Sequence, residues 1–231
     1  MIDFSNFEKK TGVIFNNKKL LEQAFIHRSY INENNGSKLS HNERLEFLGD
    51  AVIELIVTHY LYEKYPNYDE GSLTAFRSAL VNAVIMSEVA TNLGMNEFLL
   101  LSKGEAKDVG KARSYILANT YEAYVGAVYL DGGYDEAKKF IEKTLLIRME
   151  EIVSKKLWRD PKSLVQEKSQ EEIGVTPAYR VLHESGPDHD KHFTVGIFFG
   201  TDCIARGSGK SKQEAEQSAA KNALEVKNWL D

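Results

Sequence analysis

Residues 41–50 read His-Asn-Glu-Arg-Leu-Glu-Phe-Leu-Gly-Asp and run directly into Ala-Val-Ile-Glu-Leu-Ile-Val at residues 51–57. Glu43, Glu46 and Asp50 occupy positions i, i+3 and i+7, which fall within roughly 60° of one another on an α-helix. Three acids therefore share one face of a helix that is otherwise strongly apolar. Mutual repulsion and burial both disfavour ionised carboxylates, and a bound divalent cation removes both penalties. The stretch indicates a central helix with a candidate cation site.

A second polar face is expected on a helix over residues 114–130, where Asn119 and Glu122 are three positions apart. If the two helices pack side by side, their polar faces converge on an oxygen-lined site, to which Glu70 could add another oxygen. Carboxylate and amide oxygens without His or Cys suit Mg²⁺ or Mn²⁺. Acids at helical spacing more often form a solvated face, but the first helix is too apolar to have a wide solvent-exposed surface. Glu54 falls on the same arc, and we expect it to be an ion-pair partner.

The totals fit one large or two modest domains without a membrane span. The chain has 231 residues, of which 42% are hydrophobic and 27% charged, and its net charge is −5. No secretory signal is visible, and the single cysteine, Cys203, allows no internal disulfide, so we expect a cytoplasmic protein. The segment from Asp160 onward carries nine Lys and Arg against twelve Asp and Glu. A nucleic-acid partner would therefore need locally clustered basic groups.

The periodicity of the chain changes after about residue 155, which predicts two domains. Residues 1–155 form an all-α domain, 156–160 a linker, and 161–231 a small α+β domain of order αβββα. In the first domain we expect two short helices before residue 32 and longer helices over 42–65, 72–94 (with Ser72 as N-cap), 114–130 and 135–155. In the second we expect a helix over 163–173, strands over 179–183, 192–199 and 201–208, and a helix over 211–229.

These segments together resemble the ribonuclease III family, in its bacterial two-domain form. Residues 42–50 resemble the nine-residue motif of that family, and residues 116–123 its second catalytic segment. Residues 69–71 are similar to its intermediate acid, and residues 27–30 to its early His-x-Ser-Tyr element. The αβββα unit resembles a double-stranded RNA-binding domain. The resemblance covers essentially the whole chain, in the family's order.

The resemblance implies a role for each acid. Asp50 and Glu122 correspond to the central catalytic acids, and the metal positions are Glu46, Asn119, Glu122 and Asp50. Glu43 and Glu70 match supporting acids around the phosphates, metals or their waters. The chain departs from the family at Asn119, where Asp is common. The amide oxygen can still bind a metal, but one negative charge is lost.

The resemblance also implies the reaction: hydrolysis of double-stranded RNA with Mg²⁺, for which Mn²⁺ substitutes. The expected products carry a 5′-phosphate and a 3′-hydroxyl. Cutting by a homodimer leaves short 3′ overhangs, and the substrates are ribosomal RNA precursors, messenger RNAs and other structured RNAs. No nucleotide cofactor or membrane is expected. A protein that keeps the RNA contacts but cuts little is the alternative, which Asn119 favours. A di-iron oxidoreductase is disfavoured, because no Glu is followed by His three residues later.

In the second domain, RNA duplexes would be recognised by shape, through 2′-hydroxyls and phosphates. By resemblance, the first helix contributes Ser163, Gln166, Glu167 and Gln170, the loop before the second strand contributes His189, and the start of the last helix contributes Lys210, Ser211 and Lys212. We expect His27 to be a structural hydrogen-bonding residue rather than a base, and Cys203 to be a small strand residue. The four alanines of the last helix are expected to pack on the sheet.

Overall fold

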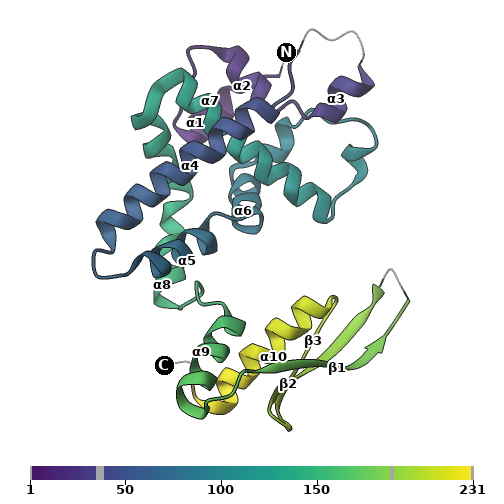
Figure 1. Cartoon of the computed structure of the whole chain (residues 1–231). Coiled ribbons are helices and arrows are strands. Elements are labelled where there is room, and N and C mark those ends of the chain that lie inside the picture. The colour runs from purple at the N-terminus through teal and green to yellow at the C-terminus, as the bar shows by residue number, and fades with distance from the viewer. Residues whose placement is uncertain (1, 35–38, 188–189, 230–231) are drawn as a thin grey trace. The chain divides into compact units, whose positions relative to one another are not determined.

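Helix α4 (Glu43–Lys64) contains the acidic stretch and packs along the longest helix, α7 (Lys111–Thr144) (Figure 1). It begins after the buried Asn42, whose amide donates a hydrogen bond of 3.1 Å to the carbonyl of Ala24. It ends at Tyr65, because Pro66 cannot continue a helix. The helix predicted over residues 42–65 is therefore confirmed within one residue at each end.

The computed structural model describes residues 2–34, 39–187 and 190–229. The chain divides into two units, Met1–Trp158 and Arg159–Asp231, each with its own hydrophobic core. The division falls within the predicted linker, and Trp158 packs on Phe76 of the first unit with ring centroids 4.8 Å apart. The domain limits 1–155 and 161–231 stay a prediction.

The first unit is helical in its described residues, apart from an isolated bridge between Ile26 and Leu100. Its core is built mainly from α4 and α7, with four Phe side chains of the N-terminal segment (Phe4, Phe7, Phe15 and Phe25) packed on them. The remaining elements are α1 (Ser5–Thr11), α2 (Lys18–Ala24), α3 (Arg28–Glu33), α5 (Glu70–Leu80), α6 (Ala83–Leu93), α8 (Met149–Ser154) and the 3₁₀ turns η1 (Met95–Phe98), η2 (Glu105–Lys107) and η3 (Leu146–Arg148).

The helix predicted over residues 72–94 is wrong as a single element, since it is two helices. Asp69, not Ser72, caps the first, and its side chain accepts a hydrogen bond of 2.8 Å from the backbone of Ser72. Asn82 caps the second by accepting from the backbone N–H groups of Val84 and Ile85. Both caps are short polar side chains whose oxygens satisfy otherwise unpaired helix N–H groups.

Two further boundaries differ from the prediction. The N-terminal region holds three helices rather than two, because His27 caps α3. The helices expected over 114–130 and 135–155 are separated as predicted, by a non-helical break in α7 at Gly133, but the second one ends at Thr144 and is followed by η3 and α8. Gly133 has φ of 81°, a conformation that residues with a side chain rarely adopt.

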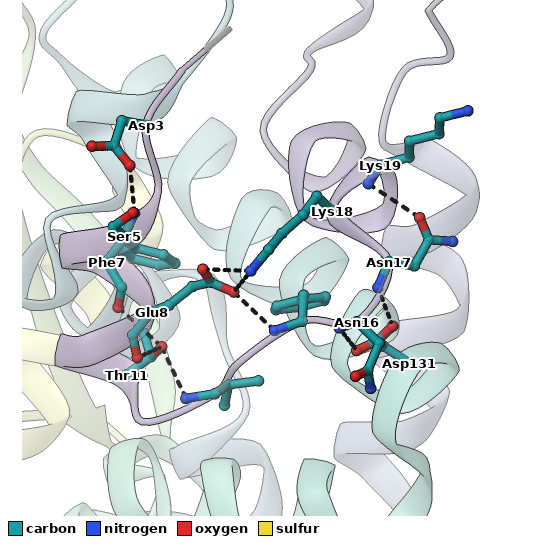
Figure 2. A network of polar contacts seen from close by, with 12 residues as sticks. Asp3, Ser5, Phe7, Glu8, Thr11, Asn16, Asn17, Lys18, Lys19 and Asp131 are labelled. Atoms are coloured by element: carbon teal, nitrogen blue, oxygen red, sulfur yellow. Dashed lines mark hydrogen bonds and ion pairs between the residues drawn. The ribbon is translucent and has the colours of Figure 1, made fainter.

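A polar network fixes the N-terminal helices to α7 (Figure 2). The buried carboxylate of Glu8 lies 2.6 Å from the ammonium of Lys18 and accepts a 2.8 Å hydrogen bond from the backbone of Phe15. Asp131 of α7 accepts backbone hydrogen bonds of 2.8 Å from Asn16 and Asn17. The turn before α2 is thereby anchored two residues before the bend of α7.

The second unit confirms the predicted αβββα order. Helix α9 (Pro161–Ile173) is followed by an antiparallel sheet of β1 (Ala178–Ser185), β2 (His192–Phe199) and β3 (Asp202–Gly209), in that order, and then by α10 (Lys212–Lys227). Ala215, Ala219, Ala220 and Ala223 are buried, as predicted. Gly207 allows this close packing, because a Cβ there would lie 2.0 Å from the backbone nitrogen of Ala219.

Within the described part of the chain, no single helix is both long and apolar enough to cross a membrane. Only α5 and α6 taken together pass that test of length and composition, and they are bent by 44°.

Candidate active site

The two acid-bearing helices touch at a pair of glycines. A Cβ on Gly49 of α4 would lie 1.8 Å from the carbonyl oxygen of Glu122, and a Cβ on Gly126 of α7 would lie 2.2 Å from the carbonyl oxygen of Leu45. Real Cβ atoms cannot approach backbone this closely, so only glycine permits the contact. The backbones therefore come together beside Glu46, Asp50 and Glu122, and this crossing gathers the acids.

The electrostatics of Glu122 show how crowded the acids are. Burial is the main cause that raises the pKa of its carboxyl to about 7, and the charges of Asp50 and Glu46 raise it further. The pKa of Glu46 is also raised, first by burial and then by Glu43, with a smaller effect of Asp50. Two acids of α4 therefore act on Glu122 of α7, as the convergence of the two polar faces predicts.

Asn119 and Arg28 partly relieve this repulsion. A side-chain hydrogen bond from Asn119 lowers the pKa of Glu46, against the effect of burial, and the charge of Arg28 does so more weakly. Arg28 Nη1 lies 3.4 Å from Glu43 Oε1, and both side chains are well exposed. Glu43 is thus at the margin of the cluster, paired with a cation from α3.

The other two acids lie elsewhere on the surface of the first unit. Glu70 begins α5, where it accepts a hydrogen bond of 3.2 Å from Thr74 and lines a pocket with Tyr62 of α4. It is not among the groups that shift the pKa of Glu46 or Glu122. Glu54 lies 2.9 Å from Arg77 Nε, which confirms the predicted ion pair.

The donors present fit a divalent cation. Glu46, Asp50, Glu122 and Asn119 offer carboxylate and amide oxygens, the ligands that Mg²⁺ and Mn²⁺ prefer. The raised pKa values of Glu46 and Glu122 mark a crowding of acids that a cation relieves. No three His, Cys, Asp or Glu side chains of the described residues are gathered as a closed ligand set. The metal site and its residue roles therefore stay a prediction.

The residues singled out in the second unit are all accessible where the structure describes them. Ser163, Gln166, Glu167 and Gln170 are exposed on α9, and Lys210, Ser211 and Lys212 are exposed before and at the start of α10. Ser211 caps that helix, with its hydroxyl accepting from the backbone of Glu214 at 3.1 Å. His189 lies outside the described residues. Two helices of the unit thus present polar and basic groups, as contacts to a duplex require.

His27 and Cys203 have the surroundings expected of them. The ring of His27 accepts the backbone N–H of Ser29, and its Nδ1 lies 2.8 Å from the Ser29 hydroxyl. Burial lowers the pKa of His27. Cys203 is an exposed free thiol on β3.

Comparisons with known proteins match the whole of this architecture. Residues 17–149 match the model of the ribonuclease-III-like family, and residues 161–227 match the double-stranded RNA binding motif. A protein named ribonuclease 3 from Bdellovibrio bacteriovorus is 43% identical over 96% of this chain and 95% of its own length. The chain belongs to the ribonuclease III family.

Further relatives agree. The ribonuclease 3 of Protochlamydia amoebophila is 45% identical over 94% of this chain and 89% of its own length. The solved nuclease domain of ribonuclease III from Campylobacter jejuni is 36% identical, with a TM-score of 0.57 over 62% of this chain and 96% of that chain. This ribonuclease III is accordingly an endoribonuclease that acts on double-stranded RNA. An oxidoreductase is excluded.

Sequence reasoning missed the part of this ribonuclease III site that sets the helix spacing. Gly49 and Gly126 permit the crossing, and Arg28 pairs with the marginal acid Glu43. A glycine in the middle of an otherwise apolar helix costs stability unless the backbone needs it, so Gly49 and Gly126 were the available signal. Arg28 gave no signal, because its partner is on another helix.

Proposed function

We propose that this enzyme is a divalent-metal-dependent hydrolase that leaves a 5′-phosphate and a 3′-hydroxyl. The observation that carries the proposal is the contact of α4 with α7 at Gly49 and Gly126, which brings Glu46 and Asp50 close enough to raise the pKa of Glu122 and so describes a donor set that favours a cation. A bound Mg²⁺ or Mn²⁺ would lower the pKa of the attacking water and stabilise the negative charge that develops on the leaving oxygen. Glu46, Asp50, Glu122 and the amide oxygen of Asn119 would hold it.

The remaining acids and the second unit position the substrate. Glu43, at the exposed margin of the cluster beside Arg28, would act where a phosphate approaches. The exposed polar face of α9 and the two lysines at α10 would hold the duplex by its 2′-hydroxyls and phosphates, with no base-specific contact needed. Structured RNAs with long duplex stems, such as ribosomal RNA precursors and some messenger RNAs, are the substrates we infer. The single cysteine agrees with a cytoplasmic enzyme.

A homodimer is supported by an apolar stripe on α4. Phe47, Leu55 and Tyr62 fall within about 80° of one another on the helix, and they are 82%, 59% and 74% exposed. The stripe adjoins the acid face, because Phe47 is four residues after Glu43 and three before Asp50 on the same helix. The C. jejuni nuclease domain likewise has a region involved in dimer formation. Two copies of this chain packed along the stripe would bring their acid faces together, as staggered cuts require.

The pocket beside Glu70 is a candidate binding site for an apolar side chain of the second copy. It has a volume of about 470 Å³ and is lined by Thr58, Leu61, Tyr62 and Leu73. An exposed Phe47 at one end of α4 and an apolar pocket at its other end are complementary in a symmetric pair. If the partner's Phe47 fills the pocket, Glu70 comes close to the partner's Glu46. Glu70 would then support the active site across the interface rather than within one chain.

One assay tests the reaction. The protein is incubated with a long RNA duplex and Mg²⁺ or Mn²⁺, and the ends of the products are mapped. We expect discrete fragments with 5′-phosphates, 3′-hydroxyls and short 3′ overhangs, lost in EDTA and with Glu122→Ala. Binding without fragments under either metal would favour the alternative, a protein that binds RNA and cuts little.

A further inference from the structure

A second pocket lies next to the acid cluster. Its volume is about 460 Å³, and its polar lining comes from three segments: His27, Arg28, Ser29 and Asn32 at α3, Glu105 in η2, and Tyr115 in the first turns of α7. Arg28 pairs with Glu43 beside the acid cluster, but none of these side chains is among the metal ligands proposed above. The pocket therefore needs a separate account.

Two features place this pocket beside the acids. Arg28, which lines it, lies 3.4 Å from Glu43 and also influences the pKa of Glu46. Tyr115 is four residues before Asn119 on α7, so the two side chains lie one above the other on the same face of the helix. Arg28 therefore links the pocket to the acid cluster.

The lining offers hydrogen-bonding groups of both kinds. Because His27 Nδ1 accepts the backbone N–H of Ser29, the ring proton is on Nε2, and no described residue accepts it. The carboxylate of Glu105 acts electrostatically on His27, yet it makes no ion pair or hydrogen bond with any residue that the structure describes. Tyr115 is 52% exposed, so its ring is open to solvent. The pocket thus holds one free donor, one free acceptor and an aromatic surface.

Besides the donor, the acceptor and the aromatic ring, the pocket contains the cationic side chain of Arg28, which is only weakly paired. The ion pair between Arg28 and Glu43 is long and exposed, and such pairs contribute little to stability. Arg28 can therefore move from Glu43 to a phosphate at small cost. A ligand that satisfies the whole lining needs a negative charge for Arg28, a flat or apolar part for Tyr115 and a hydroxyl donor for Glu105. A ribonucleotide unit has all three, whereas a deoxyribonucleotide lacks the hydroxyl at the 2′ position.

We propose that this pocket binds one sugar–phosphate unit of the RNA strand beside the cut, with Glu105 accepting a hydrogen bond from its 2′-hydroxyl. Arg28 contacts the phosphate, and Tyr115 packs on the ribose or base. The pocket thereby contributes to the choice of RNA over DNA within the nuclease domain itself. This inference rests on the proposed function, because it assumes that the acid cluster is where the strand is cut.

The test pairs protein variants with single-atom changes in the substrate. A hairpin duplex with one cut site is made with a single 2′-deoxynucleotide at each position near the cut, and kcat/KM is measured for each. For the wild type, one position should lower kcat/KM about tenfold, the effect of one hydrogen bond to a charged group. With Glu105→Ala that penalty should disappear, whereas Glu97→Ala, which removes an exposed acid outside the pocket, should keep it. Equal penalties in all three proteins at every position would overturn the proposal.

A binding measurement separates this proposal from the reaction itself. The same duplexes are titrated in Ca²⁺ and the dissociation constant is measured, after thermal unfolding has shown that each variant is folded. If the wild type cuts no RNA, the proposed function fails. The pocket is still supported if the 2′-deoxy penalty in binding depends on Glu105, and it is refuted if the penalty does not. Arg28→Gln should also reduce the salt dependence of binding by one phosphate contact, while Lys9→Gln on α1 should not.

Discussion

The carbonyl oxygen of Glu122 lies against Gly49, so close that a Cβ on Gly49 would be 1.8 Å away. The reciprocal contact of Gly126 with the carbonyl of Leu45 holds the crossing from the other side. A residue proposed to bind the metal is thus fixed by the packing of its own backbone, and helix α4 sets its distance from Asp50. The spacing of the acids depends on two glycines that carry no chemistry.

Gly49→Ala is therefore expected to destabilise the first unit. The added methyl group meets backbone, which cannot rotate away, so α4 and α7 must separate. We expect the free energy of unfolding to fall by about 3 kcal/mol, at the upper end of overpacking effects. Urea denaturation followed by circular dichroism measures this change. Gly71→Ala is the matched control, because its nearest atom outside the adjoining residues is 3.9 Å away, and there alanine should be neutral or stabilising. Equal stability of the two variants would contradict the close contact.

The pKa of Glu122 predicts how stability changes with pH in the absence of divalent cations. Burial first, and then Asp50 and Glu46, raise this pKa from 4.5 to about 7. Between these values the folded protein binds a proton that the unfolded chain does not. Protonation of Glu122 therefore stabilises the folded protein fully below about pH 4.5, and this stabilisation is lost as pH rises through 7.

Glu122→Gln should remove the part of the pH dependence of the free energy of unfolding that Glu122 causes. In EDTA at about pH 8 the variant should be more stable than the wild type by about 1–2 kcal/mol, a value reduced for partial solvent contact. Near pH 4.5 the two should be alike. Urea denaturation across this range measures the difference. If the free energies of unfolding of the two proteins differed by the same amount at all pH values, the pKa of Glu122 would not be raised in the folded protein.

Asn119→Asp tests the departure from the family. The substitution restores a negative charge but removes the amide that donates to Glu46. Divalent cations should bind roughly tenfold more tightly, because ligand charge sets affinity in oxygen-donor sites. Calorimetric titration with Mg²⁺ and Mn²⁺ measures the affinity directly, and the metal-free variant should be less stable than the wild type. Asn119→Ala is the control, and it should bind metal more weakly than either. Unchanged affinity in Asn119→Asp would remove this residue from the metal site.

Most of this architecture could be predicted from residue patterns, and the misses have physical causes. The acid spacing predicted α4, and the change of period near residue 155 predicted the second unit. The break between α5 and α6 was missed, because Leu80, Val84 and Val89 continue an apolar helical pattern across the cap at Asn82. Spacing along one helix cannot report a contact between helices, so the pairing of Gly49 with Glu122 was also out of reach. The resemblance to the family supplied the roles of the acids, and the structure supplied their proximity.

Phe47→Asp is expected to break the proposed homodimer. A side chain that is 82% exposed in one chain would lose its apolar contact and place a charge in the interface. Analytical ultracentrifugation should show the mass of one chain for this variant and of two chains for the wild type. Ile14→Asp is the matched control, since Ile14 is 67% exposed on a different surface, and it should leave the mass unchanged. A wild type that sediments as a single chain at micromolar concentration would refute the dimer.

Lys210→Ala combined with Lys212→Ala tests the placement of RNA on the second unit. Both lysines are exposed beside the N-terminus of α10, and Lys210 Nζ lies 3.8 Å from Asp190 Oδ1. If each neutralises one phosphate, their loss should weaken duplex binding and reduce the slope of log affinity against log salt by about two. Fluorescence anisotropy at several salt concentrations measures the slope. Lys227→Ala, at the opposite end of α10, should leave it unchanged. An unaltered slope in the double variant would move the phosphate contacts away from this end of the helix, and the duplex would then have to cross the unit on another face.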